Sequence, residues 1–291
     1  MRQTRFQIAK KDIIATFEEY NNNIFSYKDI SEILAKNRRF WRLPLNLTTN
    51  DFIALLINAK KLKRYTLNFP SGTTSRFVWG ETSPFSLALN LKTDSYFTHY
   101  TACFWHNLTD QIPKTIYVNQ EQSQKKAGKV QLLQDAIDRA FAKPLRTSSN
   151  IAAFGDYKIC LLNGKFTGKT GVTEMTTPET GKMMVTDLER TLIDIVVRPS
   201  YSGGIHEVLN AYKKAAGKVS INKLSVVLKK LSYIYPYHQA IGFYLQKAGV
   251  YTDMQIRLLK KFQFEFDFYL THQMKETEYS KEWRLYYPKG F

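Results

Sequence analysis

The sequence has few cysteines, no long apolar run and comparatively few acidic residues. Its two cysteines, Cys103 and Cys160, are too few for the disulfide framework of a small secreted protein. No apolar run approaches the about 20 residues that a membrane-spanning helix needs. The opening residues, MRQTRFQIAKKD, are basic and lack the apolar core of a signal peptide. We therefore expect a cytoplasmic protein that does not associate with membranes and whose thiols are buried.

Positive charge exceeds negative charge by 17, because 42 lysines and arginines face 25 aspartates and glutamates. Such an excess is expected for a protein that binds nucleic acid, where contact with phosphates releases counterions. A generally basic proteome would give the same number, so the placement of the charge is more informative. The apolar fraction of 44% indicates a packed globular protein, and 291 residues predict two domains.

Residues 1 to about 80 are predicted to form three helices followed by a β-hairpin. Apolar residues recur at helical spacing in 8–20 and again after Ser26, where Asp29 completes a capping box. Polar residues at 48–50 are predicted to begin a third helix that runs to about residue 62. Two strand-like stretches flank a glycine-containing turn at 71–74. This is the order of a winged helix-turn-helix, so we assign residues 1–82 to a DNA-binding domain.

The third predicted helix has one apolar and one polar face. Phe52, Ile53, Leu56 and Ala59 gather on one side. A recognition helix needs this division, because one face docks on its own domain and the other enters the major groove. Between residues 36 and 64, eight lysines and arginines accompany one acid and would contact phosphates. The candidate DNA-binding residues are Arg38, Arg39, Arg42, Asn50, Asn58, Lys61 and Arg76.

Two other interpretations of this region stay open. Solvated lysines and arginines around an ordinary small helical unit would give the same charge pattern. A winged helix can also serve purely as a protein-interaction module.

No recognisable catalytic or metal-binding arrangement is present in the sequence. The stretch GKFTGKT at 164–170 has one residue too few between its glycines for a phosphate-binding loop, so we interpret it as a basic turn. The best enzyme candidate is a nuclease that uses Glu265 and Asp267, which would share one face of a strand at 262–270. Alternation of charged and aromatic residues on a half-exposed strand gives the same spacing. We expect no enzymatic activity, no cofactor and no metal.

The stretch VTDLERTLIDIVVRP at 185–199 is predicted to be a well-capped helix. Thr186 and Glu189 have the spacing of a capping box, and Arg190 and Asp194 lie four residues apart, so they can form a pair. Pro199 ends the helix, and a strongly helical C-terminal part follows. Residues 83–291 are thus predicted to form a mixed α/β domain, which makes the whole chain α+β.

Three segments resemble AbiEi-family antitoxins, which are also described as transcriptional regulators of viral defence systems. The stretch VTDLERTLIDIVVRPSYSGGIHEVLNAY is similar to the signature of that family. The stretch YFTHYTACFWHNLTDQIPKTIYV at 96–118 resembles its helix, turn and strand, and residues 282–288 are similar to its C-terminal strand. The resemblance runs from about residue 85 to the end and is thinnest in 119–184.

The resemblance implies an antitoxin of a type IV toxin–antitoxin system, which acts in phage defence by abortive infection. Residues 83–291 would neutralise a nucleotidyltransferase toxin, directly or through its target, while the winged helix binds operator DNA and represses the operon. The alternatives are a plain winged-helix transcriptional regulator without antitoxin activity, or a metal-dependent nuclease. The positions that match the family motif, whose role is either functional or structural, are Thr186, Glu189, Arg190, Thr191 and Asp194.

Overall fold

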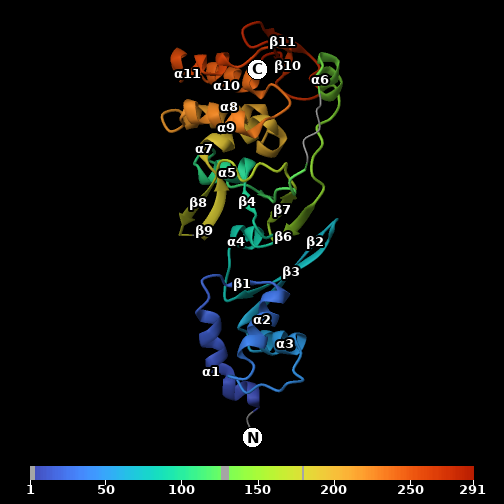
Figure 1. The fold of residues 1–291 in the computed structure, drawn as a ribbon, viewed down its shortest axis with the longest axis vertical. Coiled ribbons are helices and arrows are strands. Elements are labelled where there is room, and N and C mark those ends of the chain that lie inside the picture. The colour runs from blue at the N-terminus through green and yellow to red at the C-terminus, as the bar shows by residue number, and fades with distance from the viewer. Residues whose placement is uncertain (1–3, 126–130, 179) are drawn as a thin grey trace. The chain divides into compact units, whose positions relative to one another are not determined.

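The computed structural model describes residues 4–125, 131–178 and 180–291 and combines helices with three β-sheets, so the fold is α+β (Figure 1). The chain forms two compact units. The first unit contains the residues up to Thr93 together with Asn150–Tyr157, and the second contains Asp94–Ser149 and Lys158–Phe291.

The first unit begins with three helices and a three-stranded antiparallel sheet. Its sheet has the order β1-β3-β2, and β2 and β3 form a hairpin whose register runs from Leu62 opposite Trp79 to Phe69 opposite Gly72. The elements in chain order are α1 (Arg5–Glu18), β1 (Ile24–Phe25), α2 (Tyr27–Asn37), α3 (Thr49–Asn58), β2 (Leu62–Phe69), β3 (Gly72–Trp79) and α4 (Pro84–Leu89).

Each of the first three helices begins at a capping box, which satisfies backbone N–H groups that have no partner inside the helix. The side chains of Thr4, Ser26 and Thr48 each accept a hydrogen bond from the backbone three residues later, and the third residue returns one. The capping box predicted at Ser26 and the start predicted for the third helix are confirmed. The third helix ends at Asn58, earlier than predicted.

The stretch that follows the hairpin completes the first unit. It contains α4, where Phe85 and Leu87 are buried. The strand β6 (Ile151–Phe154) also belongs to this unit and contacts β2. Just before β6, the side chain of Ser71 donates to that of Asn150 at 2.7 Å. The first unit is therefore built from two separate stretches of the chain.

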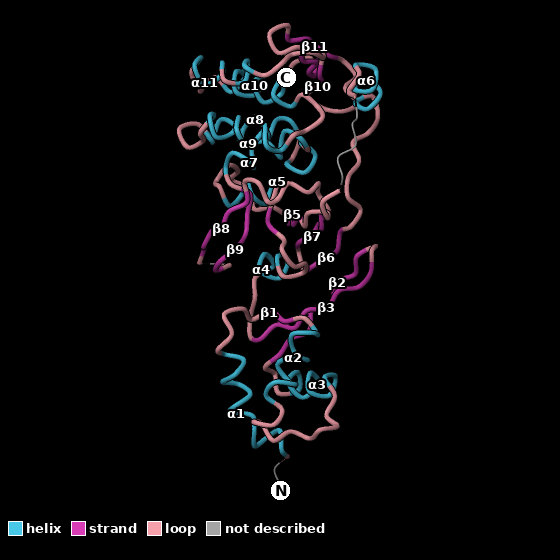
Figure 2. The backbone as a smooth tube through the Cα atoms, viewed as in Figure 1, coloured by secondary structure: helices cyan, strands magenta, loops and turns pink. Residues whose placement is uncertain are grey.

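The second unit places a sheet beside a helical C-terminal part (Figures 1 and 2). Its main strands follow the order β7-β5-β4-β9-β8, and a small sheet has the order β10-β12-β11. The strands are β4 (Tyr96–Phe97), β5 (Thr115–Asn119), β7 (Tyr157–Leu162), β8 (Val172–Thr177), β9 (Gly181–Thr186), β10 (Phe268–Tyr269), β11 (Thr277–Ser280) and β12 (Leu285–Pro288). The helices are α5 (His99–Trp105), α6 (Gln134–Phe141), α7 (Leu188–Val197), α8 (Ile205–Ala215), α9 (Ile221–Leu231), α10 (Tyr237–Ala248) and α11 (Asp253–Arg257), with short 3-10 turns at Pro199–Ser202 and Leu259–Lys261.

The helix α7 lies at the centre of the second unit, where it contacts α5, α8, α9 and α10. Its apolar residues Leu192, Ile193 and Ile195 are fully buried. Burial of three such side chains stabilises the unit by about 5 kcal/mol or more before the loss of chain entropy is counted. The packing explains why a short helix is stable here, since an isolated helix of this length is marginal in water.

Two sequence-based expectations for this unit are wrong. The helix α7 is capped by Asp187, whose carboxylate accepts from the backbone N–H of Arg190 at 2.8 Å, and not by Thr186 with Glu189. Thr186 is instead the last residue of strand β9 and precedes the N-cap residue Asp187. The predicted strand at 262–270 is reduced to Phe268–Tyr269, so Glu265 and Asp267 do not share a strand face.

Candidate functional site

The five residues that match the family motif are buried around α7. Thr186, Glu189, Arg190, Thr191 and Asp194 are each at most 5% exposed. Polar groups at this depth lower the stability of a protein unless they find hydrogen-bond partners. Each of the five finds such partners, as the following contacts show.

Arg190 and Asp194 form a buried ion pair along one side of α7. The Nε atom of Arg190 lies 2.7 Å from Oδ1 of Asp194, and Nη1 donates to the carbonyl oxygen of Thr170 at 2.7 Å. The other carboxylate oxygen of Asp194 accepts from Thr98 Oγ1 at 3.0 Å. Burial opposes the charge of Arg190, but the neighbouring Asp194 outweighs that effect and raises the pKa of the guanidinium. The pair predicted from the spacing is confirmed, and both of its side chains are buried.

Glu189 joins the start of α7 to the start of α9. Its carboxylate accepts from the backbone N–H of Ser220 at 3.0 Å and from Lys223 Nζ at 2.7 Å. Lys223 Nζ also lies 2.9 Å from the carboxylate of Asp187. Burial raises the pKa of Glu189, but these hydrogen bonds outweigh it and hold the pKa below its ordinary value. Glu189 therefore has a structural role in this fold.

The two threonines of the motif join strand β9 to α7. The hydroxyls of Thr186 and Thr191 lie 2.8 Å apart, and Thr191 Oγ1 also donates to the carbonyl oxygen of Thr186 at 3.1 Å. The same carbonyl lies 2.7 Å from Nε2 of His106. These contacts fix the turn between the strand and the helix.

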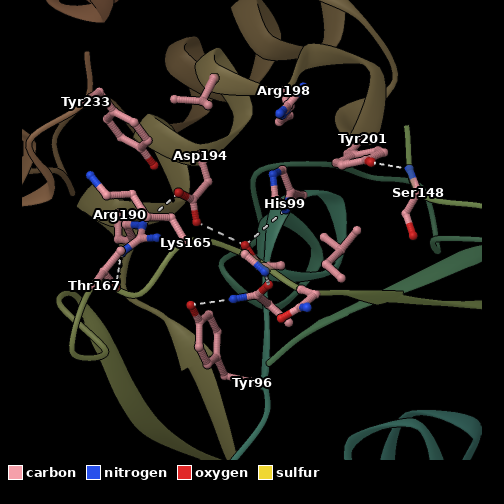
Figure 3. A pocket seen from close by; sticks show the side chains of 16 residues that line it. Tyr96, His99, Ser148, Lys165, Thr167, Arg190, Asp194, Arg198, Tyr201 and Tyr233 are labelled. Carbon is pink, nitrogen blue, oxygen red and sulfur yellow. Dashed lines mark hydrogen bonds and ion pairs between the residues drawn. The ribbon is translucent and has the colours of Figure 1, made fainter. Parts of the chain in front are cut away.

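A cavity of about 410 Å³ opens beside α7 within the second unit. Figure 3 shows that its side chains come from several separate segments, with Arg190 and Asp194 on one wall. Its polar and aromatic lining includes Tyr96, Thr98, His99, Asn119, Ser148, Lys165, Thr167, Arg190, Asp194, Arg198, Tyr201 and Tyr233.

The lining of this cavity is positively charged. Among the described residues that line it, Lys165, Arg190 and Arg198 are cationic and Asp194 is the one carboxylate. Asp194 is already paired with Arg190. Within the described part of the chain, Lys165 and Arg198 therefore have no ion-pair partner. Burial lowers the pKa of His99 to about 4. The nearby Arg190 and Arg198 lower this pKa further, whereas Asp194 raises it. The ring of His99 is therefore neutral near pH 7.

Sequence reasoning missed Lys165, Arg198 and His99 as a group. Lys165 and Arg198 are 33 residues apart, and the fold alone brings them to one cavity. The local signal is the glycine-rich GKFTGKT stretch, which contains Lys165 and is predicted from the sequence to be a basic turn. The structure has turns and loop over this stretch and places Lys165 beside the C-terminal end of α9, where its Nζ donates to the carbonyl of Ser232 at 3.0 Å.

In the first unit, the helix α3 has the predicted division of its faces. Phe52, Ile53 and Leu56 are at most 1% exposed, whereas Asn50 and Asn58 are exposed. Ala54 and Asp51 are exposed on the same side as the asparagines. Trp41 packs against Phe52 with its ring centroid 5.6 Å away, which anchors the segment before the helix. The helix thus exposes a row of small and polar side chains.

The basic candidates of the first unit differ in their surroundings. Arg39 and Arg42 are exposed in the turns between α2 and α3, and Lys61 is half-buried in the turn between α3 and β2. Arg38 donates to the carbonyl oxygens of Pro44, Leu45 and Leu47 and holds the loop before α3.

Arg76 is half-buried against the end of α4. It donates from Nε to the carbonyl oxygen of Asn90 at 2.7 Å and from Nη2 to that of Leu91 at 2.6 Å. Burial lowers the pKa of its guanidinium. Its role in this structure is to hold the stretch after the hairpin in place.

The two carboxylates of the nuclease alternative lie in different environments. Asp267 accepts from Arg284 Nε at 2.9 Å and from the hydroxyl of Tyr279 at 2.7 Å, while Glu265 is exposed. Within residues 4–125, 131–178 and 180–291, no group of three or more His, Cys, Asp or Glu side chains is arranged to hold a metal ion. In the same ranges, no helix has both the length and the apolar character needed to cross a bilayer.

Comparison with known proteins finds a likeness among solved structures. No protein-family model and no curated protein matches the chain. The crystal structure of the RV2827C protein from Mycobacterium tuberculosis is similar over 96% of this chain and 91% of that chain, with a TM-score of 0.60 and 12% sequence identity. At this identity the likeness shows a shared fold across both units and carries no conclusion about activity.

Proposed function

We propose that this protein is an autorepressing antitoxin of a type IV toxin–antitoxin system. In this proposal the first unit binds operator DNA as a winged helix-turn-helix, and the second unit neutralises a nucleotidyltransferase toxin. The proposal takes the protein to be a regulator and antitoxin rather than an enzyme.

The observation that carries the DNA-binding half is the division of α3. A recognition helix docks through apolar residues and offers short polar side chains to the base edges of the major groove. The buried Phe52 and Leu56 satisfy the first demand, and the exposed Asn50 and Asn58 satisfy the second. The order α1, β1, α2, α3, β2, β3 and the sheet order β1-β3-β2 also agree with a winged helix.

The charge around α3 supports the same half. Arg39 and Arg42 are exposed before this helix and Lys60 is exposed after it, so they would flank the base contacts on the phosphates. Arg38 and Arg76 are half-buried and bound to backbone carbonyls, so we expect them to support the shape of the unit rather than contact DNA.

The DNA-binding half is tested by measuring the affinity of the full chain for the region upstream of its own gene. Replacing Asn58 by alanine should weaken binding to this region by about tenfold while binding to unrelated DNA is unchanged, because one base contact contributes about 1–3 kcal/mol of discrimination. Asn222→Ala, which changes an exposed asparagine on α9, is the matched control. Equal affinity of the unchanged protein for both DNAs would refute this half.

The antitoxin half is supported by the resemblance of three segments to AbiEi-family antitoxins. All three segments lie in the second unit, so this unit is where we expect neutralisation. The motif residues are buried in hydrogen-bonded contacts, so we expect their replacement to act through folding rather than through a lost contact with the toxin. Exposed residues of the second unit are the better places to look for that contact.

Toxin rescue tests the antitoxin half. The neighbouring nucleotidyltransferase gene, once identified, is induced in cells that carry the full chain or its Asn58→Ala variant. We expect both to restore growth, because neutralisation is assigned to the second unit and Asn58 lies in the first. Failure of both to rescue, while the unchanged chain still binds its operator, would leave a plain winged-helix regulator.

A further inference from the structure

We propose that the cavity beside α7 binds a small phosphomonoester that carries a planar ring, such as a nucleoside monophosphate. This site is separate from the surface of α3 and does not depend on the proposed antitoxin function. It would make the second unit responsive to a metabolite.

The first support is the charge of the cavity. Arg190 and Arg198 approach it from α7 and from its C-terminal end, and Lys165 approaches it from the loop after β7. The single lining carboxylate, Asp194, is engaged by Arg190 and Thr98. Two positive charges therefore remain for a ligand. A phosphomonoester carries up to two negative charges at neutral pH and would compensate both.

The second support is the number of donors that remain. A lysine ammonium has three donors, and Lys165 Nζ uses two of them on the carbonyl oxygens of Leu231 and Ser232. Within the described part of the chain, the side chain of Arg198 makes one long hydrogen bond of 3.4 Å, from Nη1 to the carbonyl oxygen of Arg146. A guanidinium has five donors, so several of them remain for a phosphate. The backbone bonds of Lys165 also hold its head group in place before a ligand arrives.

The third support is the aromatic part of the lining. Tyr201 and Tyr233 line the cavity and provide flat apolar surface on which a ring can stack. Tyr96 also lines it but is 1% exposed, with its hydroxyl bonded to Asn119 and Glu121. The neutral ring of His99 has one donor and one acceptor, and Thr98 Oγ1 lies 3.1 Å from its Nδ1. Such a ring can hydrogen-bond to the edge of a base without adding charge.

The size of the cavity selects a molecule larger than an inorganic anion. Its volume of about 410 Å³ falls within the roughly 300–1,000 Å³ of pockets that enclose small organic ligands. A bare phosphate would fill only a small part of it and would not use the aromatic part of its lining. Charge and size together therefore indicate an organic phosphate.

Calorimetric titration of the full chain tests this inference. The probes are AMP, GMP, CMP and UMP, the corresponding nucleosides and inorganic phosphate, at about 0.15 M ionic strength. We expect at least one nucleotide to bind with a Kd below about 1 mM, and its nucleoside to bind at least about tenfold more weakly. Absence of binding by every nucleotide, or equal binding of nucleoside and nucleotide, overturns the proposal. If inorganic phosphate binds as tightly as the best nucleotide, the inference that the ligand carries a planar ring is overturned.

Variants locate the binding at this cavity. Lys165→Gln and Arg198→Gln should each weaken nucleotide binding about tenfold or more, because each removes a charged donor to the phosphate. Lys213→Gln changes an exposed lysine on α8 outside the cavity and should bind like the unchanged protein. Operator affinity and the circular dichroism spectrum of each variant show whether it is folded. A folded Lys165→Gln/Arg198→Gln protein with undiminished nucleotide affinity overturns the proposal.

Discussion

Replacing Asp194 by alanine should destabilise the second unit far more than replacing an exposed carboxylate. The change leaves the guanidinium of Arg190, which is 5% exposed, without its ion-pair partner, and removes the acceptor of Thr98. Removing one member of a buried pair costs about 3–5 kcal/mol, because the remaining charge stays away from water. For a unit of this size, the midpoint of thermal unfolding should fall by roughly 6–20 °C.

The control is the exposed pair between Glu174 and Lys182 on β8 and β9. Its atoms are 3.1 Å apart and the two side chains are 54% and 75% exposed, so solvent screens the attraction. Glu174→Ala should therefore cost less than about 1 kcal/mol.

The assay is urea unfolding followed by pulsed hydrogen exchange, read on peptides from each unit, because the two units need not unfold together. Equal destabilisation by Asp194→Ala and Glu174→Ala would refute the account of the buried pair. A double variant, Arg190→Met with Asp194→Leu, separates the charge from the packing. It should recover much of the loss, since an apolar pair of similar volume leaves no charge without a partner.

Three further predictions concern other parts of the molecule. Gly242→Ala should lower the free energy of unfolding by about 1–3 kcal/mol or more, because the added Cβ would lie 2.0 Å from the ring of Trp283. Urea unfolding measures this change, and an unchanged free energy of unfolding would contradict the packing of Trp283 against Gly242. Burial lowers the pKa of His238 to about 4. Acidification from about pH 6.5 to about pH 4 should therefore lower the free energy of unfolding by up to about 3 kcal/mol, and His238→Phe should make this free energy less dependent on pH. Arg39→Gln should reduce the salt dependence of DNA binding by about one unit of slope, measured by titration at several salt concentrations, and an unchanged slope would remove Arg39 from the phosphate contacts.

Local chemistry made much of the first unit predictable. Ser26 with Asp29 marks the start of α2 because the capping box is contained within four residues. The faces of α3 follow from helical spacing alone, and burial of Phe52 and Leu56 agrees with it. The hairpin is likewise local, since Gly72 stands at its turn with a φ of 130° that favours glycine.

Contacts with distant backbone could not be predicted in this way. Arg76 contacts the carbonyl oxygens of Asn90 and Leu91, and any residue type provides such an oxygen, so the sequence contains no pattern for it. At α7, Thr186 and Asp187 both have side chains suited to a cap, and the extent of strand β9 decides between them. The cavity beside α7 also depends on long-range packing, because Lys165 and Arg198 belong to no common motif.

The stretch Asn150–Tyr157 belongs to the first unit, although the chain before and after it belongs to the second. The polypeptide therefore passes between the units three times, and no single cut releases a first unit with all of its parts. A truncation near residue 82 would remove α4 and β6 from the hairpin that they accompany, including the partner of Ser71. A recombination event that joins the first unit to a foreign partner must therefore also carry residues 150–157, which are encoded between two segments of the second unit.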